Sequence, residues 1–415
     1  MLRLLQALRP ALPILLGASV MLSLSMGLRQ SMGLFMPHVT RDIGISVSDF
    51  TLAIAVQNLA WGVLQPFAGA WSVRWGLRSI MAGGAALYVA ALALLACAGS
   101  MTAVMVGAGL LVGAALACTG SALAMSAATR AVSPAQRSMV LGMVSAAGSI
   151  GAMVAAPMGQ MLTESMGWRV GMWGFAALAL MMVPAAWIAG RADTIALPPA
   201  AAGSADAANS TSTAREVLRT AAGNGPFVIM AIAFFVCGMQ LVFITTHLPT
   251  YLVLCGLDPM LSAQALGVIG ASNVLGSLFF GWAGGRWNKL LLLGGIYIAR
   301  SLVLAGYFMA APTPASTLVF AGLMGFLWLG VVPLVAGSVA EMFGLRWQAM
   351  LQGVAFFSHQ LGSFVGAFGG GMLYDAMGSY ELAWRVAVAV GLAAGVLQMG
   401  AAFSRPPSRG LLQAA

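Results

Sequence analysis

Long apolar runs constrain this chain more than any other feature. Of its 415 residues, 60% are hydrophobic and 7% are charged, which is unlike the composition of soluble globular domains. In hydrocarbon a helix satisfies its own backbone groups, and about 20 apolar residues cross the core. Runs of this length occupy residues 12–36, 50–72, 79–99, 102–129, 138–163, 169–190, 226–254, 262–284, 290–311, 314–340, 349–373 and 382–404. We therefore predict an all-α membrane protein with twelve transmembrane helices, the first retained because it is too long for a signal peptide.

The basic residues favour one side of the membrane. The net charge is +9, and alternating topology assigns to one side Arg3, Arg9, Arg74, Arg78, Arg130, Arg137, Arg191, Arg215, Arg219, Arg286, Lys289, Arg346, Arg405 and Arg409. The other side receives only Arg41, Arg169 and Arg385. By the positive-inside rule we expect a multi-pass protein with both termini cytoplasmic. The short loops favour a bacterial inner membrane. The basic excess sets topology and attracts anionic lipid. Without interleaved aromatic residues, it does not indicate nucleic acid binding.

A polar segment rich in Pro, Ser, Thr and Ala divides the chain. It contains LPPAAAGSADAANSTSTAREV, whose low hydrophobicity is typical of a linker. Within it, AREVLRT has the pattern of a short amphipathic turn. We predict a six-helix bundle over residues 1–190, a cytoplasmic linker over 191–225 and a second six-helix bundle over 226–415.

The two halves contain related sequences. GAWSVRW at 69–75 and GWAGGRW at 281–287 share the pattern G-x-x-x-x-R-W. At nearly the same spacing, residues 141–167 align with residues 352–378, with glycines in common. Parallel six-helix repeats are an architecture of secondary transporters, with the substrate site between them near the midplane. The sequence therefore predicts two pseudo-symmetric bundles that move a substrate by alternating access.

Over almost its whole length the chain resembles the major facilitator superfamily. That family carries a G-x-x-x-D-R-x-G-x-R signature after the second span and a degenerate copy after the eighth. The resemblance implies a conformational latch at Gly69, Arg74, Arg78, Gly281 and Arg286. Val73 and Gly285 occupy the positions of the family acid. We therefore expect a weaker latch, held by Trp75, Trp287 and helix-terminal dipoles.

Two arginines interrupt apolar runs far from their ends. Arg29 lies roughly 14 Å from the end of its run and Arg300 roughly 16 Å, at 1.5 Å per residue. The ten acidic residues all fall in loops or at span ends: Asp42, Asp49, Glu164, Asp193, Asp206, Glu216, Asp258, Glu341, Asp375 and Glu381. Buried guanidinium groups without a buried carboxylate leave an electropositive cavity. We infer that the cargo is the counter-ion, a small organic anion and most simply a carboxylate.

Each arginine has an alternative role. Span one lines the central cavity in the resembled family, which favours substrate contact for Arg29 over a structural role. Span nine is peripheral there, so Arg300 either contacts substrate or clamps carbonyl groups or Asn273. Further candidates recur at helical spacing, and each either contacts substrate or bridges helices. These are Gln30, Gln57, Gln240, His247, Asn273, His359 and Gln360, with Trp61, Gln65, Ser277, Gln352 and Ser363 on the same faces.

Within the superfamily, the chain most resembles monocarboxylate porters and the oxalate-formate exchanger. The resemblance lies in RQSMGLFMPHV of span one and SNVLGSLFFGW of span eight. Animal monocarboxylate transporters have a basic residue near the position of Arg29. They also have an Asp and an Arg where this chain has Asn273 and Ser277, so the proton-linked acid is missing. Proton-linked uptake, with His359 or His247 as the protonatable group, and anion exchange both remain open.

The prediction is thus a secondary transporter of a small mono- or dicarboxylate. The alternatives are a multidrug or metabolite efflux pump and an importer of a larger anionic nutrient such as a siderophore. Exporters of lipophilic cations usually need a buried acid, which this sequence lacks. Catalytic motifs such as HExxH and GxSxG are absent from the sequence, which argues against an enzyme. Cys97, Cys118, Cys237 and Cys255 show no metal-ligand spacing and are expected to be small buried hydrophobes. We expect a monomer without cofactor or metal.

Overall fold

The computed structural model describes residues 8–196 and 212–403, which form helices and connecting turns without a strand. Within these residues, ten helical stretches are long and apolar enough to cross a membrane. One of them, Val47–Ala96, has 50 residues and bends at Gly76, whose φ is 83°. It therefore contains two spans. The helices from Gln348 to Met377 form one more membrane-length stretch. The all-α membrane fold is confirmed.

The first half consists of α2 (Leu12–Gln30), η1 (Ser31–Phe35), α3 (Met36–Ile43), α4 (Val47–Ala96), α5 (Met101–Val104), η2 (Met105–Leu111), α6 (Val112–Thr119), α7 (Ser121–Arg130), α8 (Pro134–Met166), α9 (Trp168–Leu180), α10 (Met182–Ala189) and η3 (Gly190–Thr194). The second half consists of α12 (Ala214–Ala222), α13 (Gly225–Leu254), α14 (Pro259–Ala283), α15 (Lys289–Phe308), α16 (Pro314–Trp328), α17 (Val331–Phe343), α18 (Gln348–Phe364), η4 (Val365–Gly369), α19 (Gly370–Met377) and α20 (Glu381–Phe403).

Local signals start and stop these helices. Ser46 and Asp49 form a capping box at the start of α4, and the Asn224 side chain caps α13. Gly44 and Gly256, both with φ of 74°, follow α3 and α13. These helices occupy corresponding places in the two halves, so the repeat extends to the turns. Glycine is required there because a side chain disfavours positive φ.

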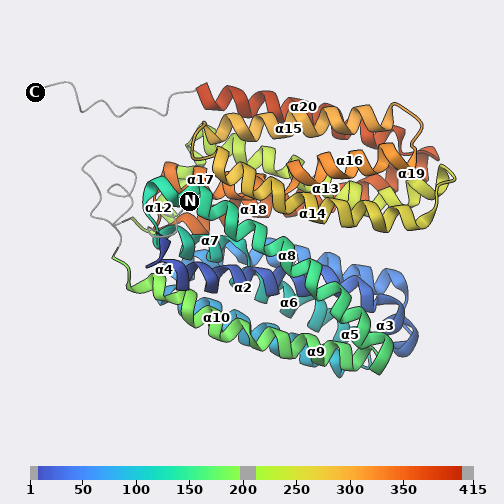
Figure 1. The fold of residues 1–415 in the computed structure, drawn as a ribbon, viewed down its shortest axis with the longest axis horizontal. Helices are drawn as coiled ribbons and strands as arrows, with labels where there is room; N and C mark the ends of the chain where they lie inside the picture. The colour runs from blue at the N-terminus through green and yellow to red at the C-terminus, as the bar shows by residue number, and fades with distance from the viewer. Residues whose placement is uncertain (1–7, 197–211, 404–415) are drawn as a thin grey trace, which may run out of the picture.

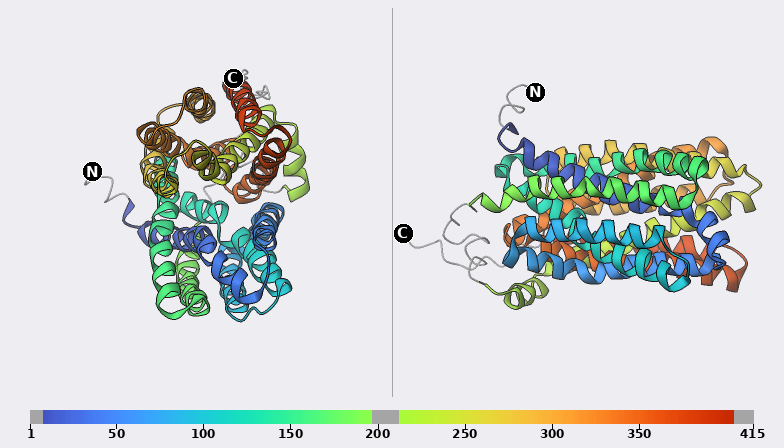
Figure 2. Two further views of the ribbon diagram at one scale, coloured as in Figure 1. Left: turned by 90° about the vertical axis from the view of Figure 1, so that its right-hand side faces the viewer. Right: turned by 90° about the horizontal axis from the view of Figure 1, so that it is seen from below.

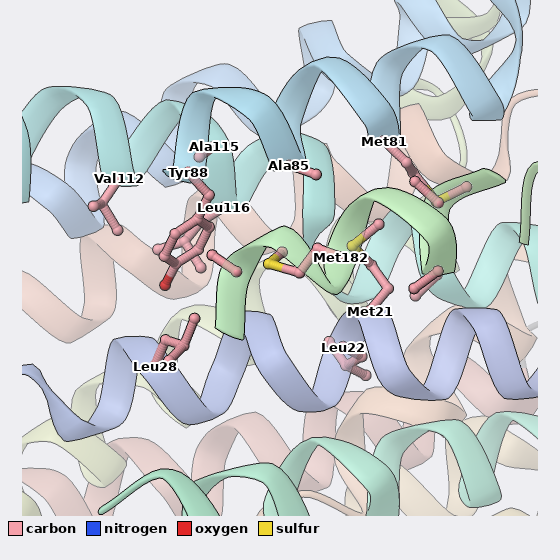
Figure 3. Packing of buried hydrophobic residues seen from close by; sticks show 14 of the residues in the cluster. Met21, Leu22, Leu28, Met81, Ala85, Tyr88, Val112, Ala115, Leu116 and Met182 are labelled. Carbon is pink, nitrogen blue, oxygen red and sulfur yellow. The ribbon is translucent and has the colours of Figure 1, made fainter. Parts of the chain in front are cut away.

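The helices form two groups that lie side by side (Figure 1; Figure 2, left). Nearly all of one hydrophobic cluster comes from residues before the linker, and the other comes from residues after it. In the first, Met21, Leu28, Tyr88 and Leu116 bring α2, α4 and α6 together (Figure 3). The Tyr88 hydroxyl donates to the Ser25 carbonyl at 3.2 Å. Each group thus has its own core.

The two groups touch most closely at one end of the molecule, which we call the linker end because α12 and η3 lie there. Gly142 of α8 and Gly281 of α14 meet backbone to backbone, so that a Cβ on Gly281 would lie 2.5 Å from the Gly142 Cα. Toward the opposite end, α8 and α14 diverge (Figure 1). The described helices therefore form two bundles closed against each other at the linker end.

The linker itself falls partly outside the described residues, as do Arg3, Asp206, Arg405 and Arg409. The predicted amphipathic turn forms α12, which buries Val217 and Ala221 against α13 and exposes its polar face. Glu216 completes a capping box with Thr213, and hydrogen bonds from the Thr213 backbone and side chain lower the pKa of this carboxyl. The exact bundle limits, at 190 and 226, stay a prediction.

Candidate functional site

Two membrane helices break at the centre of the molecule. The fourth span breaks at extended Gly120, between α6 and α7, and the tenth breaks between α16 and α17. The breaks are separated by nearly the spacing of the sequence repeat. The Asn273 side chain accepts from the Leu329 amide at 3.2 Å, so it satisfies a donor freed by the second break.

A small cavity of about 20 Å³ lies between the bundles at the level of these breaks. Ser121 and Ala122, at the N-terminus of α7, line it, as does Val332 at the N-terminus of α17. The amide nitrogen of Gln65 and the amide oxygen of Gln352 also border it and have no hydrogen-bond partner among the described residues. Helix N-termini carry a positive dipole end. The cavity is therefore mainly apolar, with two amide atoms that lack a described partner, and the two helix N-termini add a positive potential.

Arg29 lies at the end of α2 and contacts Trp61, which is hydrogen-bonded to Gln65 in the wall of this cavity. Pro37 cannot donate to the carbonyl of Gly33, and the chain tightens into the 3₁₀ turn η1 directly after Arg29 and Gln30. The Arg29 guanidinium donates to the Asn58 side-chain oxygen at 2.5 Å and lies 5.0 Å from the centre of the Trp61 ring. Its Nε has no described partner. Arg29 is half-buried and forms no ion pair in the described structure.

Trp61 connects Arg29 to the second bundle. Its ring packs over Gly120, where a Cβ would lie 3.4 Å from the indole, and its Nε1 donates to the Gln65 side chain at 2.5 Å. On the other side it packs on Phe356 of α18, with ring centres 4.5 Å apart. Phe356 in turn stacks on His359. Arg29, Trp61, Phe356 and His359 thus form a continuous path across the contact between the bundles.

Gln360 closes this contact with a hydrogen bond. Its amide nitrogen donates to the Asn58 carbonyl at 3.1 Å, while the Asn58 side chain receives Arg29. The other inter-bundle bonds lie nearer the linker end, such as Thr129 to Gln348 at 2.7 Å. Arg29, Asn58 and Gln360 therefore lie at the outermost of these hydrogen-bonded levels. His359 is within electrostatic range of both Arg29 and Arg300.

Arg300 has a different environment. It is fully buried inside the second bundle and donates to the Cys237 Sγ at 3.1 Å and the Cys237 carbonyl at 3.3 Å. Neither the Arg300 Nε nor the nearby Tyr297 hydroxyl has a described partner. The expected alternative of a carbonyl clamp describes this contact, although the clamp joins Cys237 and not Asn273. The contacts of Arg300 therefore fit a clamp on a carbonyl group better than a role in contacting substrate.

The remaining candidates mostly bridge helices within one bundle. Gln57 donates to the Ala108 carbonyl at 2.7 Å, and Gln240 donates to the Ala387 carbonyl at 2.9 Å. His247 is 2.9 Å from the Ala367 carbonyl. Gln30 is exposed. Of the residues predicted to contact substrate, the structure gathers Arg29, His359 and Gln360 at the bundle contact.

The latch region contains the two tryptophans expected to hold it. The rings of Trp75 and Trp287 are about half exposed and, among the described contacts, pack on Trp71 and Trp282 of their own bundles. These ring contacts lie within one bundle each, so the expectation that the two tryptophans hold the bundles together stays a prediction. Gly69 lets α4 approach the backbone at Met350, in the same way that Gly281 approaches Gly142.

Asp193 supplies a carboxylate to the loop that lacks its family acid. It accepts from the Leu77 and Arg78 amides, both at 2.9 Å, and lies 3.7 Å from Arg130. These amides begin the helix after Gly76, so the charge also meets a helix N-terminus. Arg74 and Arg286 lie over the rings of Trp75 and Trp282. A carboxylate from the end of the sixth span thus lies in the loop in which Val73 stands at the position of the family acid.

Sequence reasoning did not select Asn58 or Asp193, and it treated all four cysteines as buried. Asn58 follows Gln57 directly and lies three residues before Trp61, so its helical face was available as a signal. Cys97 and Cys255 are exposed at helix ends, whereas Cys237 is buried and accepts from Arg300. The described acidic residues lie in turns or near helix ends, as expected. Within the described residues no group of His, Cys, Asp and Glu could hold a metal ion.

A matched pair of substitutions tests the Arg300 contact. Cys237→Val removes the acceptor and leaves a buried guanidinium nitrogen unpaired, which is expected to destabilise the protein by about 1–3 kcal/mol. Cys237→Ser keeps an acceptor of similar size and is expected to change stability little. Thermal unfolding in detergent measures both. Equal stability of the two variants would contradict a structural role for the Cys237–Arg300 contact.

Known proteins with similar sequences carry the names of transporters, and one family model matches most of this chain. The model of the Major Facilitator Superfamily matches residues 15–367. Monocarboxylate transporter 11 of Mus musculus is 25% identical over 394 residues, covering 91% of this chain and 84% of that protein. Monocarboxylate transporter 13 of Bos taurus is 26% identical over 352 residues, covering 84% and 78%.

Two solved structures share the fold. The E. coli fucose:proton symporter FucP superposes with a TM-score of 0.70 at 15% identity, covering 94% of this chain and 98% of that one. The proton:xylose symporter XylE gives a TM-score of 0.68 at 13% identity, with 95% of each chain covered. At these identities the likeness concerns the fold alone.

Proposed function

We propose, from the premise that this chain belongs to the Major Facilitator Superfamily and is a secondary transporter, that its cargo is a small organic anion. A mono- or dicarboxylate is the simplest such cargo. The proposal rests on the surroundings of Arg29. Its guanidinium is half-buried at the contact between two bundles, with a neutral amide and an aromatic ring as neighbours and no ion pair in the described structure. An entering carboxylate would accept paired hydrogen bonds from it.

Three further observations support an anion. The N-termini of α7 and α17 border the central cavity, and half-helix N-termini in transporters point at anionic substrate groups. The described acidic residues lie in turns or near helix ends, so the centre offers no fixed carboxylate to a cationic cargo. Two of the relatives found by sequence are named monocarboxylate transporters, at 25% and 26% identity.

The charges support an orientation in the membrane. Because the linker end holds most of the described basic residues, we expect it and both termini to face the cytoplasm of a bacterial inner membrane. With that end closed, cargo would reach the Arg29 level from the opposite side. Uptake is either coupled to protons, with His359 beside the path, or balanced by a second anion.

Ligand-dependent thermal stability tests the cargo class. Purified protein is heated with acetate, lactate, oxalate, the neutral lactamide, a lipophilic phosphonium cation and a siderophore. A bound ligand raises apparent stability by mass action. We expect shifts with small carboxylates and none with lactamide. A shift with only the phosphonium cation would favour the efflux pump and contradict the proposal, and a shift with only the siderophore would contradict small cargo.

A further inference from the structure

A second and larger pocket opens at the linker end of the second bundle, away from Arg29. It has a volume of about 440 Å³ and lies between the linker ends of α13, α15, α17 and α20. Its walls include Asn224, Arg286, Lys289, Ser338 and Glu341. It belongs neither to the central cavity nor to the contacts that close the bundles.

The walls of this pocket favour an anion. Arg286 is exposed, and Lys289 pairs with Glu341, whose side chain is largely open to solvent, so these three residues contribute one net positive charge. Asn224 and Asn288 cap α13 and α15, which places the N-termini of two long helices at the pocket and adds their dipoles. Ser338 is 2% exposed, yet its hydroxyl has no described partner. A buried hydroxyl without a partner implies a missing one.

The surroundings of the pocket favour a lipid as the source of the anion. Trp282 and Trp287 are 39% and 53% exposed beside it, and their rings contact each other at 5.4 Å. Exposed tryptophans gather at the level of lipid headgroups. The Arg286 guanidinium lies 4.3 Å from the centre of the Trp282 ring, so the charge is held at the same depth. Ala402, at the end of the membrane helix α20, forms part of the wall.

We propose that this pocket binds the phosphate headgroup of an anionic phospholipid. Arg286 and Lys289 hold the phosphate, with the Ser338 hydroxyl as an additional donor. Basic pockets between transmembrane helices are known to suit such headgroups. Glu341 opposes the anion and weakens its binding. Two neighbouring charges thus have opposite effects on the same ligand.

Native mass spectrometry of the purified full chain tests the site with dioleoyl phosphatidylglycerol. We expect one lipid to remain bound, Arg286→Gln to weaken the apparent affinity roughly fivefold, and Glu341→Gln to strengthen it. Ser338→Leu fills the pocket and is expected to remove the bound lipid. Thermal unfolding shows that each variant is folded. Arg215→Gln is the matched control, because Arg215 is an exposed cation of α12 at the same end but outside the pocket.

The other outcomes contradict the proposal. If Arg215→Gln lowered the apparent lipid affinity as much as Arg286→Gln, the lipid would be attracted by the charge of the whole surface and not by the pocket. Preference for dioleoyl phosphatidylethanolamine, with weaker binding after Glu341→Gln, would assign the pocket to a headgroup with an ammonium group. Displacement of the lipid by millimolar inorganic phosphate would make soluble phosphate the ligand. None of these outcomes depends on the cargo that Arg29 receives.

Discussion

Arg29→Gln is expected to abolish carboxylate uptake and to weaken carboxylate binding at least about 30-fold. The lower limit corresponds to about 2 kcal/mol, the smallest usual cost of removing one partner from a buried charged pair. Stability is expected to change little, because the variant removes a half-buried charge that forms no ion pair in the described structure, which offsets the loss of the hydrogen bond to Asn58 and of one cation–π contact of about 0.5–1 kcal/mol. Uptake into liposomes and thermal shifts with lactate measure the two effects.

Two matched variants sharpen this test. Arg29→Lys keeps the charge but loses the planar fork, so we expect partial binding with weaker discrimination among carboxylates. Arg41→Gln removes an exposed cation at the end of the molecule opposite the linker end and is expected to leave uptake nearly unchanged. Normal uptake by Arg29→Gln would remove Arg29 from the site. Equal losses in Arg29→Gln and Arg41→Gln would indicate attraction of anions by surface charge.

The sequence was sufficient to predict the fold because the bilayer imposes one dominant rule. Each apolar run of about 20 residues lies largely within a helical stretch of membrane length, although two runs share α4 and others are divided by breaks. The repeat at GAWSVRW and GWAGGRW predicted two related halves. The helix breaks at Gly120 and before α17 were not predicted. A single glycine within a membrane helix is too common to signal a break, and only the Trp61 ring over Gly120 makes the reason visible.

The candidate site could be predicted only in part. Depth in the apolar runs selected Arg29 and Arg300 equally, and only the family resemblance, through the place of each span, favoured Arg29. Their different environments depend on what faces them: Arg29 meets Asn58 of another helix at the bundle contact, whereas Arg300 meets Cys237 inside one bundle. These hydrogen-bond partners are 29 and 63 residues away along the chain. Contacts over such separations leave no periodic pattern in a single sequence. The same reason hid Asp193, which reaches the loop near Val73 from more than 100 residues away.

Arg29 can release cargo to the other side only if the linker end opens, and the closed contact there rests on glycine. A Cβ on Gly281 would lie 2.5 Å from the Gly142 Cα and 3.0 Å from the Ser138 carbonyl oxygen, and both are backbone atoms that cannot rotate away. Gly281→Leu is therefore expected to hold the bundles apart at this end. Overpacking costs about 1–3 kcal/mol in the closed state, which shifts the population about 5-fold to 150-fold toward the open state.

Labelling of a single cysteine reports this shift. Ala349→Cys, in a background without the four native cysteines, places a thiol at a position that is 2% exposed next to Gly69 in the closed contact. We expect Gly281→Leu to raise its rate of labelling and to lower uptake at least about fivefold. Gly267→Leu, on the same helix but with no atom within 4 Å of its Cβ position, is the control and is expected to change neither. A backbone contact this close cannot accept a leucine and stay closed. Unchanged labelling in Gly281→Leu would therefore show that the contact between Gly142 and Gly281 packs the bundles without controlling access.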